Sequence, residues 1–205
     1  MKTTRSRSRL IVLGLSGVLL AGGRAPAADT PANDHCAAAA KPSPFRRSQA
    51  EYALPEVTLR DQAGRPVPIR DLERVSGPLA VNFIFTTCTT ICPVMTATFA
   101  QMRRELGPEA DKIRLVSISI DPEHDSPAVL AGYAERFGAP PGWSFLTGSP
   151  KDVEKVLRAF DAWASSKTNH RPITLLRRGG ESEWVRLEGL GGGAALADQV
   201  RSVLN

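Results

Sequence analysis

Residues 79–95, LAVNFIFTTCTTICPVM, decide the fold of this chain. Their first part is a continuous apolar run, typical of a strand buried on both faces of a parallel sheet. Pro93, which suits the first turn of a helix, then opens a stretch with apolar residues at helical spacing. Cys88 and Cys92 therefore lie where a buried strand passes into a helix, and backbone N–H groups with the helix dipole favour thiolates there.

Strand-like and helix-like segments alternate through the rest of the chain. Buried strands joined by helical crossovers indicate an α/β fold, a central mixed sheet with helices on both faces. In such sheets functional residues gather beyond the carboxyl ends of the strands. Strands are expected at 54–60, 67–70, 79–85, 113–120, 144–146, 173–177 and 184–187, and helices at 93–106, 127–137, 151–162 and 194–204.

The amino-terminal residues have the pattern of an export signal. A basic start precedes a mostly apolar run at 10–21, and the sequence Ala-Pro-Ala that ends at Ala27 is a small-x-small cleavage site. The run is short for a membrane span, which needs about 20 residues. We therefore expect an export signal at 1–27, with retention as an N-terminal membrane anchor as the alternative. Residues 28–50, rich in Ala and Pro, predict a flexible tether, and 51–205 form the domain.

The charge of the chain gives no sign of nucleic-acid binding. The formal net charge is +5, but the signal-like start holds five basic residues and no acidic ones, which leaves 21 of each in the remainder. The exported part is therefore near neutral, and the high isoelectric point is no sign of nucleic-acid binding. An export signal predicts a periplasmic protein that meets an oxidising compartment.

The spacing of the two close cysteines allows two kinds of chemistry. At four residues apart on a helical or near-helical stretch, the side chains of Cys88 and Cys92 share one face, about 5–6 Å apart at Cβ. They can exchange disulfides or hold a soft metal ion. A purely structural disulfide is disfavoured, because so short a loop restrains the unfolded chain little. Cys36, next to His35 in the tether, is the odd cysteine.

Three segments carry a resemblance to a known family. They are FTTCTTICP at 85–93, VSISIDPEHDSP at 116–127 and, more loosely, KTNHRPITLL at 167–176. Over about residues 50–204 the chain resembles the Sco/SenC family. The resemblance implies a thioredoxin-like fold, copper as the bound ion, and a role in assembling the copper-A centre of cytochrome c oxidase.

The resemblance also implies which residues hold the metal. Cys88 and Cys92 match the family's two thiolate ligands, and His170 matches its late histidine ligand. Cu(I) is soft and accepts low coordination numbers, which suits two thiolates and one imidazole. The family usually has an acid before the histidine, where this chain has Asn169. No carboxylate is therefore expected to support the imidazole from that position.

Other polar residues near these segments have weaker claims. Asp121 and Asp125 flank the loop after the second buried strand, and they are candidates for supporting the site or docking a partner. Asp125 or Ser126 is also expected to cap the helix that follows. His35 and Cys36 could catch copper transiently, although a flexible dipeptide with an incidental thiol is the favoured interpretation.

Two functions remain open for the same thiols. The first is a copper chaperone that delivers its ion to the copper-A subunit of cytochrome c oxidase or to another acceptor. The second is a thiol–disulfide oxidoreductase that reduces the acceptor's cysteines. A peroxiredoxin-like peroxidase is a poorer match, because Phe85 stands where that pattern has proline.

Overall fold

A computed structural model describes residues 43–204 and shows an α/β fold. The strands are β1 (Arg46–Glu51), β2 (Thr58–Arg60), β3 (Pro66–Pro68), β4 (Leu79–Ile84), β5 (Arg114–Ser119), β6 (Trp143–Leu146), β7 (Ile173–Arg177) and β8 (Glu183–Glu188). The helices are α1 (Ile91–Leu106), α2 (Pro127–Arg136), α3 (Pro150–Ala159) and α4 (Gly193–Leu204), with 3-10 turns η1 (Ile69–Leu72), η2 (Gly107–Lys112) and η3 (Lys167–Asn169).

Six strands form a mixed sheet in the order β1-β8-β7-β4-β5-β6. β4, β5 and β6 run parallel, whereas β7 pairs antiparallel with β4, and β8 and β1 continue antiparallel. β2 and β3 form a separate hairpin. The register pairs Ile84 with Ser119, so β4 and β5 end at the same edge of the sheet. The loops that follow these two strands are therefore neighbours.

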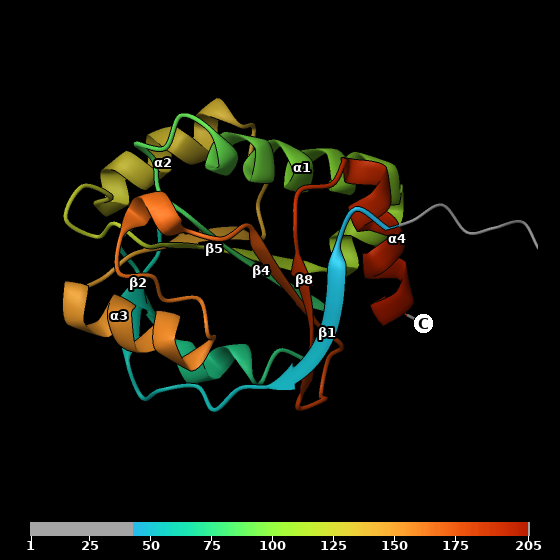
Figure 1. Ribbon diagram of the computed structural model, residues 1–205, viewed down its shortest axis with the longest axis horizontal. Helices are drawn as coiled ribbons and strands as arrows, with labels where there is room; N and C mark the ends of the chain where they lie inside the picture. Colours follow the sequence, from blue (N-terminus) through green and yellow to red (C-terminus); the bar gives the residue numbers. More distant parts are fainter. Residues whose placement is uncertain (1–42, 205) are drawn as a thin grey trace, which may run out of the picture. The chain divides into compact units, whose positions relative to one another are not determined.

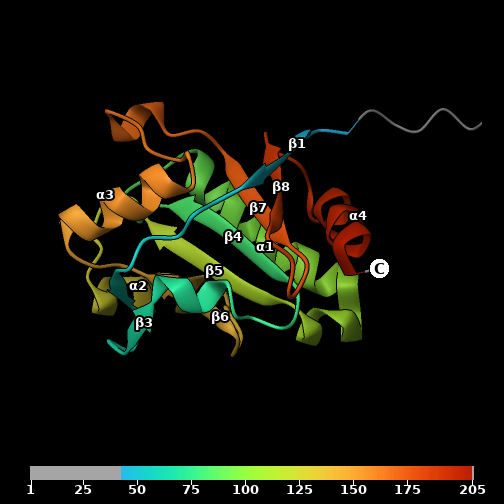
Figure 2. The same ribbon diagram turned by 90° about the horizontal axis from the view of Figure 1, so that it is seen from below.

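Two hydrophobic cores lie on the two faces of the sheet. Side chains of β4 alternate between them, with Ala80 and Ile84 on one side and Val81 and Phe83 on the other. The first core is covered by α1, α2 and α4, and the second by α3 and η1. Figures 1 and 2 show these helices on opposite sides of the sheet. The expected mixed sheet with helices on both faces is confirmed.

The structured domain begins earlier than the sequence predicts. Residues 46–50, assigned to the flexible tether, belong to β1, which pairs with β8 along its whole length. The strand was missed because RRSQAE has no alternation of apolar residues; nearly all its side chains are exposed at the sheet edge. Backbone pairing and polar contacts such as that of Gln49 with Glu183 hold it instead.

The predicted export signal at 1–27 and most of the tether, including His35 and Cys36, lie outside the described residues. Among residues 43–204, none of the helices combines the length and apolar character that crossing a membrane requires.

Candidate functional site

The two cysteines lie together between β4 and α1. The helix begins at Ile91, two residues before the predicted start, so Cys92 belongs to its first turn. Pro93 fits there because the first backbone N–H groups of a helix have no partner within the helix. The backbone N–H of Cys92 donates to Sγ of Cys88 at 3.4 Å. The Cys88 sulfur thus accepts one of the unpaired donors at the helix start.

The two thiols differ in acidity. Burial opposes the Cys88 thiolate, but hydrogen bonds from Cys92 and Thr90 together outweigh it and lower the pKa of Cys88 below its ordinary 9.0. Burial raises the pKa of Cys92 to about 12, and the neighbouring Cys88 and Asp125 add to this effect. Both thiols are free within the described chain. Cys88 is therefore the better thiolate, and Cys92 holds its proton.

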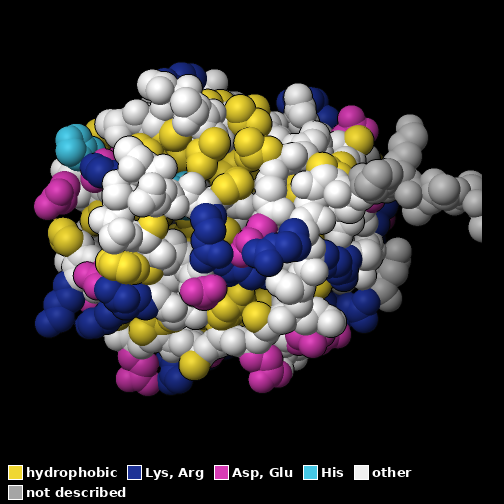
Figure 3. Space-filling view, in the orientation of Figure 1, with side chains coloured by type: hydrophobic (Ala, Val, Ile, Leu, Met, Phe, Trp, Pro, Cys, Tyr) yellow, Lys and Arg dark blue, Asp and Glu magenta, His cyan; other side chains and the backbone are white. Residues whose placement is uncertain are grey.

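The stretch of chain that carries the thiols has no charged residue of its own. No charged residue occurs from Val75 to Met102. In Figure 3 apolar and uncharged side chains predominate in the upper part of the molecule, where α1 lies, and charged side chains gather across the middle and below. The pKa of Cys88 is therefore lowered by backbone and hydroxyl groups rather than by a neighbouring cation.

Asp125 anchors the cysteine loop to the adjacent strand. Its carboxylate is completely buried and accepts from the backbone N–H and hydroxyl of Thr86 and from the hydroxyl of Ser119. Ser126, not Asp125, caps α2, because its side chain accepts from the N–H of Val129. Of the two predicted capping candidates, Ser126 is confirmed, and Asp125 instead links the ends of β4 and β5.

His170 lies buried at the end of η3, just before β7. One ring nitrogen, Nε2, is 2.9 Å from the carbonyl oxygen of Phe83, so it carries the proton, and Nδ1 keeps its lone pair. Nδ1 is buried and has no hydrogen-bond partner among residues 43–204. Burial lowers the pKa of His170, although the Phe83 carbonyl partly offsets this. The imidazole is therefore neutral near pH 7, the form that binds metals.

The cysteine loop and the start of the segment that ends at His170 line one hollow, without forming a complete metal site among the described residues. A hollow of about 280 Å³ is lined by Phe85 and residues 87–91 on one side and by Lys167 and Thr168 on the other. The ring centroids of Phe85 and His170 are 6.5 Å apart. In the part of the chain that the structure describes, no three His, Cys, Asp or Glu side chains are arranged to hold a metal ion.

Asp121 faces the segment that carries His170. Its side chain is 4% exposed and accepts from Nζ of Lys167 at 2.6 Å. The ring of the exposed His124 lies 3.3 Å from the same carboxylate. The structure thus links Asp121 to Lys167, a partner that the sequence did not predict.

Several residues that shape the site were missed. The carbonyl of Phe83 supports the imidazole of His170 in place of the acid that the family usually has at position 169. Every residue has a backbone carbonyl, so the sequence gives no sign of this contact. Tyr133 lies on the expected inner face of its helix, but its hydroxyl lies 2.9 Å from Oγ1 of Thr96, which donates to the carbonyl of Cys92. The sequence feature that could have revealed this contact is Thr96, a hydroxyl residue one helical turn after Cys92.

The fold and the paired thiols at a strand-to-helix junction define a thioredoxin-like protein. The SCO1/SenC family model matches residues 46–176, more than half of the chain. The chain belongs to this family.

Curated relatives match its central part. The SCO1 protein homolog of Bacillus subtilis is 36% identical over 115 residues, which cover 54% of this chain and 58% of the relative. Protein SenC of Rhodobacter capsulatus is 27% identical over 119 residues, which cover 58% of this chain and 52% of the relative. The matches thus span about half the length of these relatives.

Solved structures share the fold over most of the domain. Bradyrhizobium japonicum ScoI with copper bound superposes with a TM-score of 0.62 at 25% identity, covering 76% of this chain and 100% of that one. BsSco, a member of the Sco family of cytochrome c oxidase assembly proteins with a disulfide switch, has a TM-score of 0.63 at 28% identity, covering 76% and 95%. These similarities confirm the thioredoxin-like fold.

Proposed function

We propose that this protein binds copper through Cys88, Cys92 and His170 and delivers it during the assembly of cytochrome c oxidase. The observation that carries the proposal is the pairing of a favoured thiolate with a second thiol, across a hollow from the segment that ends at a neutral imidazole. Two thiolates and one imidazole form a soft donor set that suits Cu(I). Copper-bound ScoI, which has the same fold, supports this choice.

The three donors are not equally ready to bind. Cys88 is the first candidate because its pKa is lowered, whereas Cys92, with a pKa of about 12, must release a proton to the solvent as it binds. Nδ1 of His170 needs no deprotonation, since its proton is on Nε2. We expect the imidazole to join after the thiolates, because the three groups do not form a metal cluster within residues 43–204.

The proposal includes a place and a partner. The predicted export signal at 1–27 would carry the domain to the periplasm, either free or held by an uncleaved N-terminal anchor. The acceptor is the copper-A subunit of cytochrome c oxidase or another copper protein. The membership of BsSco in a family of cytochrome c oxidase assembly proteins supports this partner.

The unequal thiols also favour a second function, thiol–disulfide exchange. The Cys88 thiolate would attack a disulfide of the acceptor, form a mixed disulfide and release one acceptor thiolate. Cys92 would then lose its proton and attack the Cys88 sulfur. The acceptor leaves with two thiols, and the electron pair comes from the oxidation of Cys88 and Cys92 to a disulfide. The disulfide switch of BsSco supports this alternative.

Anaerobic titration of the reduced full chain with Cu(I), against a competing Cu(I) chelator, tests the main proposal. The experiment uses a Cys36→Ser background, so that only two thiols remain. We expect tight one-to-one binding that Cys88→Ser or Cys92→Ser abolishes and His170→Ala weakens. The matched control is His124→Ala, which removes an exposed histidine.

Unchanged affinity in His170→Ala would remove His170 from the site. Weak, non-stoichiometric binding by the unaltered thiols, together with rapid reduction of a model disulfide, would favour the exchange function instead.

A further inference from the structure

The turn between β5 and α2 touches both halves of the candidate site. Its Asp125 carboxylate accepts from Thr86, which opens the cysteine loop. Its Asp121 carboxylate accepts from Lys167, the residue that begins η3. His170 ends that 3-10 turn. The thiols and the imidazole are therefore both connected to residues 121–125.

The turn itself is firmly held. The backbone N–H of Asp125 donates to the carbonyl of Asp121 at 2.9 Å, and the N–H of His124 donates to the same oxygen at 3.1 Å. The N–H of Asp121 donates to Oγ of Ser119, the last residue of β5, at 3.0 Å. The backbone of Asp121 is thus fixed relative to the sheet, and from this position its buried carboxylate pairs with Lys167.

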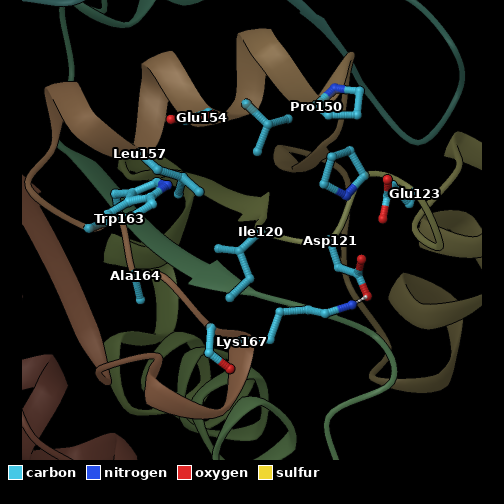
Figure 4. Close-up of a pocket in the computed structure, with 13 residues that line it drawn as sticks. Ile120, Asp121, Glu123, Pro150, Glu154, Leu157, Trp163, Ala164 and Lys167 are labelled. Carbon is cyan, nitrogen blue, oxygen red and sulfur yellow. Dashed lines mark hydrogen bonds and ion pairs between the residues drawn. The ribbon is translucent and has the colours of Figure 1, made fainter.

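The segment that carries His170 has fewer constraints. Residues 160–166 connect α3 to η3 without regular secondary structure. Asp121 and Lys167 line a cavity of about 270 Å³ together with Glu154 and Trp163. Figure 4 shows Lys167 reaching across to Asp121. Because the cavity leaves open space beside this ion pair, the segment has room to shift if the pair is broken.

We propose that the ion pair of Asp121 and Lys167 is a latch that positions His170 relative to the cysteines. Neither residue is assigned as a metal ligand, and both act through the segment that ends at His170. Asp125 completes the arrangement by fixing the cysteine loop to the same turn. This inference rests on the proposed role of His170 as a copper ligand.

The latch is tested first without copper. We compare the NMR signals of the His170 imidazole and the hydrogen exchange of residues 168–170 in the reduced, metal-free full chain and in Asp121→Asn, Lys167→Met and the double variant. Each single variant should shift or broaden the imidazole signals and speed exchange. The double variant should change them no further, because both substitutions remove one interaction. Lys167→Arg should restore the original signals.

Copper affinity is the second readout. Cu(I) binding by Lys167→Met should weaken about tenfold, the usual effect of losing support behind a metal ligand. Alkylation of Cys88 should be unchanged. Glu154→Gln is the matched control, because Glu154 lines the same cavity but pairs with Arg158 on α3. Lys167 is 44% exposed, so its replacement leaves the fold intact even if Asp121→Asn does not.

Unchanged imidazole signals in Lys167→Met, or additive effects of the two substitutions, would overturn the latch whether or not copper binds. Tighter copper binding in Lys167→Met would also overturn it, because the pair would then hold His170 away from the thiols. Failure of the unaltered protein to bind copper would reject the proposed function, and the metal-free comparison would still decide whether the ion pair orders His170.

Discussion

The cysteine loop and the segment that carries His170 face each other across one hollow, but different contacts hold them. The hydrogen bonds that set the acidity of Cys88 come from Thr90 and Cys92, two and four residues away. His170 instead depends on the carbonyl of Phe83, 87 residues away in sequence, and on the ion pair of Lys167 with Asp121, 46 residues apart.

This difference separates two kinds of function in one site. The thiolate of Cys88 is stabilised by its own loop, so its chemistry should survive small changes elsewhere. The position of His170 depends on strand register and on a distant turn, so it should respond to changes across the fold. Substitutions elsewhere in the fold should therefore change metal binding by Cys88, Cys92 and His170 more than thiol exchange by the two cysteines.

The largest effect is expected from Asp125→Ala, which removes the main long-range contact of the cysteine loop. The substitution leaves the buried hydroxyl of Ser119 and the half-buried donors of Thr86 without their acceptor. An unsatisfied buried polar group costs about 1–3 kcal/mol, so we expect a loss of about 3 kcal/mol in the free energy of unfolding. Urea unfolding at neutral pH measures it.

The control for Asp125→Ala is Ser126→Ala, which removes the cap of α2 and should cost only about 1 kcal/mol. If the cysteine loop is locally determined, Cys88 should remain the more reactive thiol in Asp125→Ala. A reversed order of thiol reactivity in that variant would show that the turn, rather than the loop, sets the acidity of Cys88.

The same contrast explains what the sequence could predict. The buried strand, the helix after it and the closeness of Cys88 and Cys92 all follow from neighbouring residues, and the structure has them. The contact between Asp121 and Lys167 was not foreseen, because it depends on how the loop after β5 meets η3 in three dimensions. The carbonyl of Phe83 was equally invisible, since every residue has one.

Edge strand β1 shows the same limit in the fold. Arg46–Glu51 contains no apolar alternation, and its strand conformation comes from pairing with β8, which lies far along the chain. A polar strand at a sheet edge buries little, so hydrophobic periodicity does not reveal it. By contrast, each half-buried or buried strand of the sheet carries its own apolar signal.

The difference in reactivity between Cys88 and Cys92 tests directly whether the cysteine loop sets the acidity of Cys88, and its effect in free energy is smaller than that of Asp125→Ala. In a Cys36→Ser background, Cys92→Ser reports Cys88 and Cys88→Ser reports Cys92. The pKa of Cys92 is raised to about 12 while that of Cys88 is lowered, so the thiolate fraction of Cys92 is much the smaller, and its greater nucleophilicity recovers only part of this. We expect iodoacetamide to alkylate Cys88 at least about tenfold faster at pH 7. In urea the two rates should converge, whereas similar rates in the folded protein would contradict the unequal acidity.

The smallest effect concerns the pH dependence of stability at His170. Because burial holds its pKa below the ordinary 6.5, the unfolded chain takes up the proton first as the pH falls. Folding stability from this group is therefore full above pH 6.5 and declines below it, by at most about 1.4 kcal/mol per pH unit. His170→Phe should remove this part of the slope in urea unfolding between pH 7.5 and 5.5. Thr168→Val, which changes the same segment without a titrating group, should keep it. Equal slopes for His170→Phe and the unaltered protein would mean that His170 takes up protons as readily in the folded chain as in the unfolded one. Protons would then compete with copper for its imidazole at acidic pH.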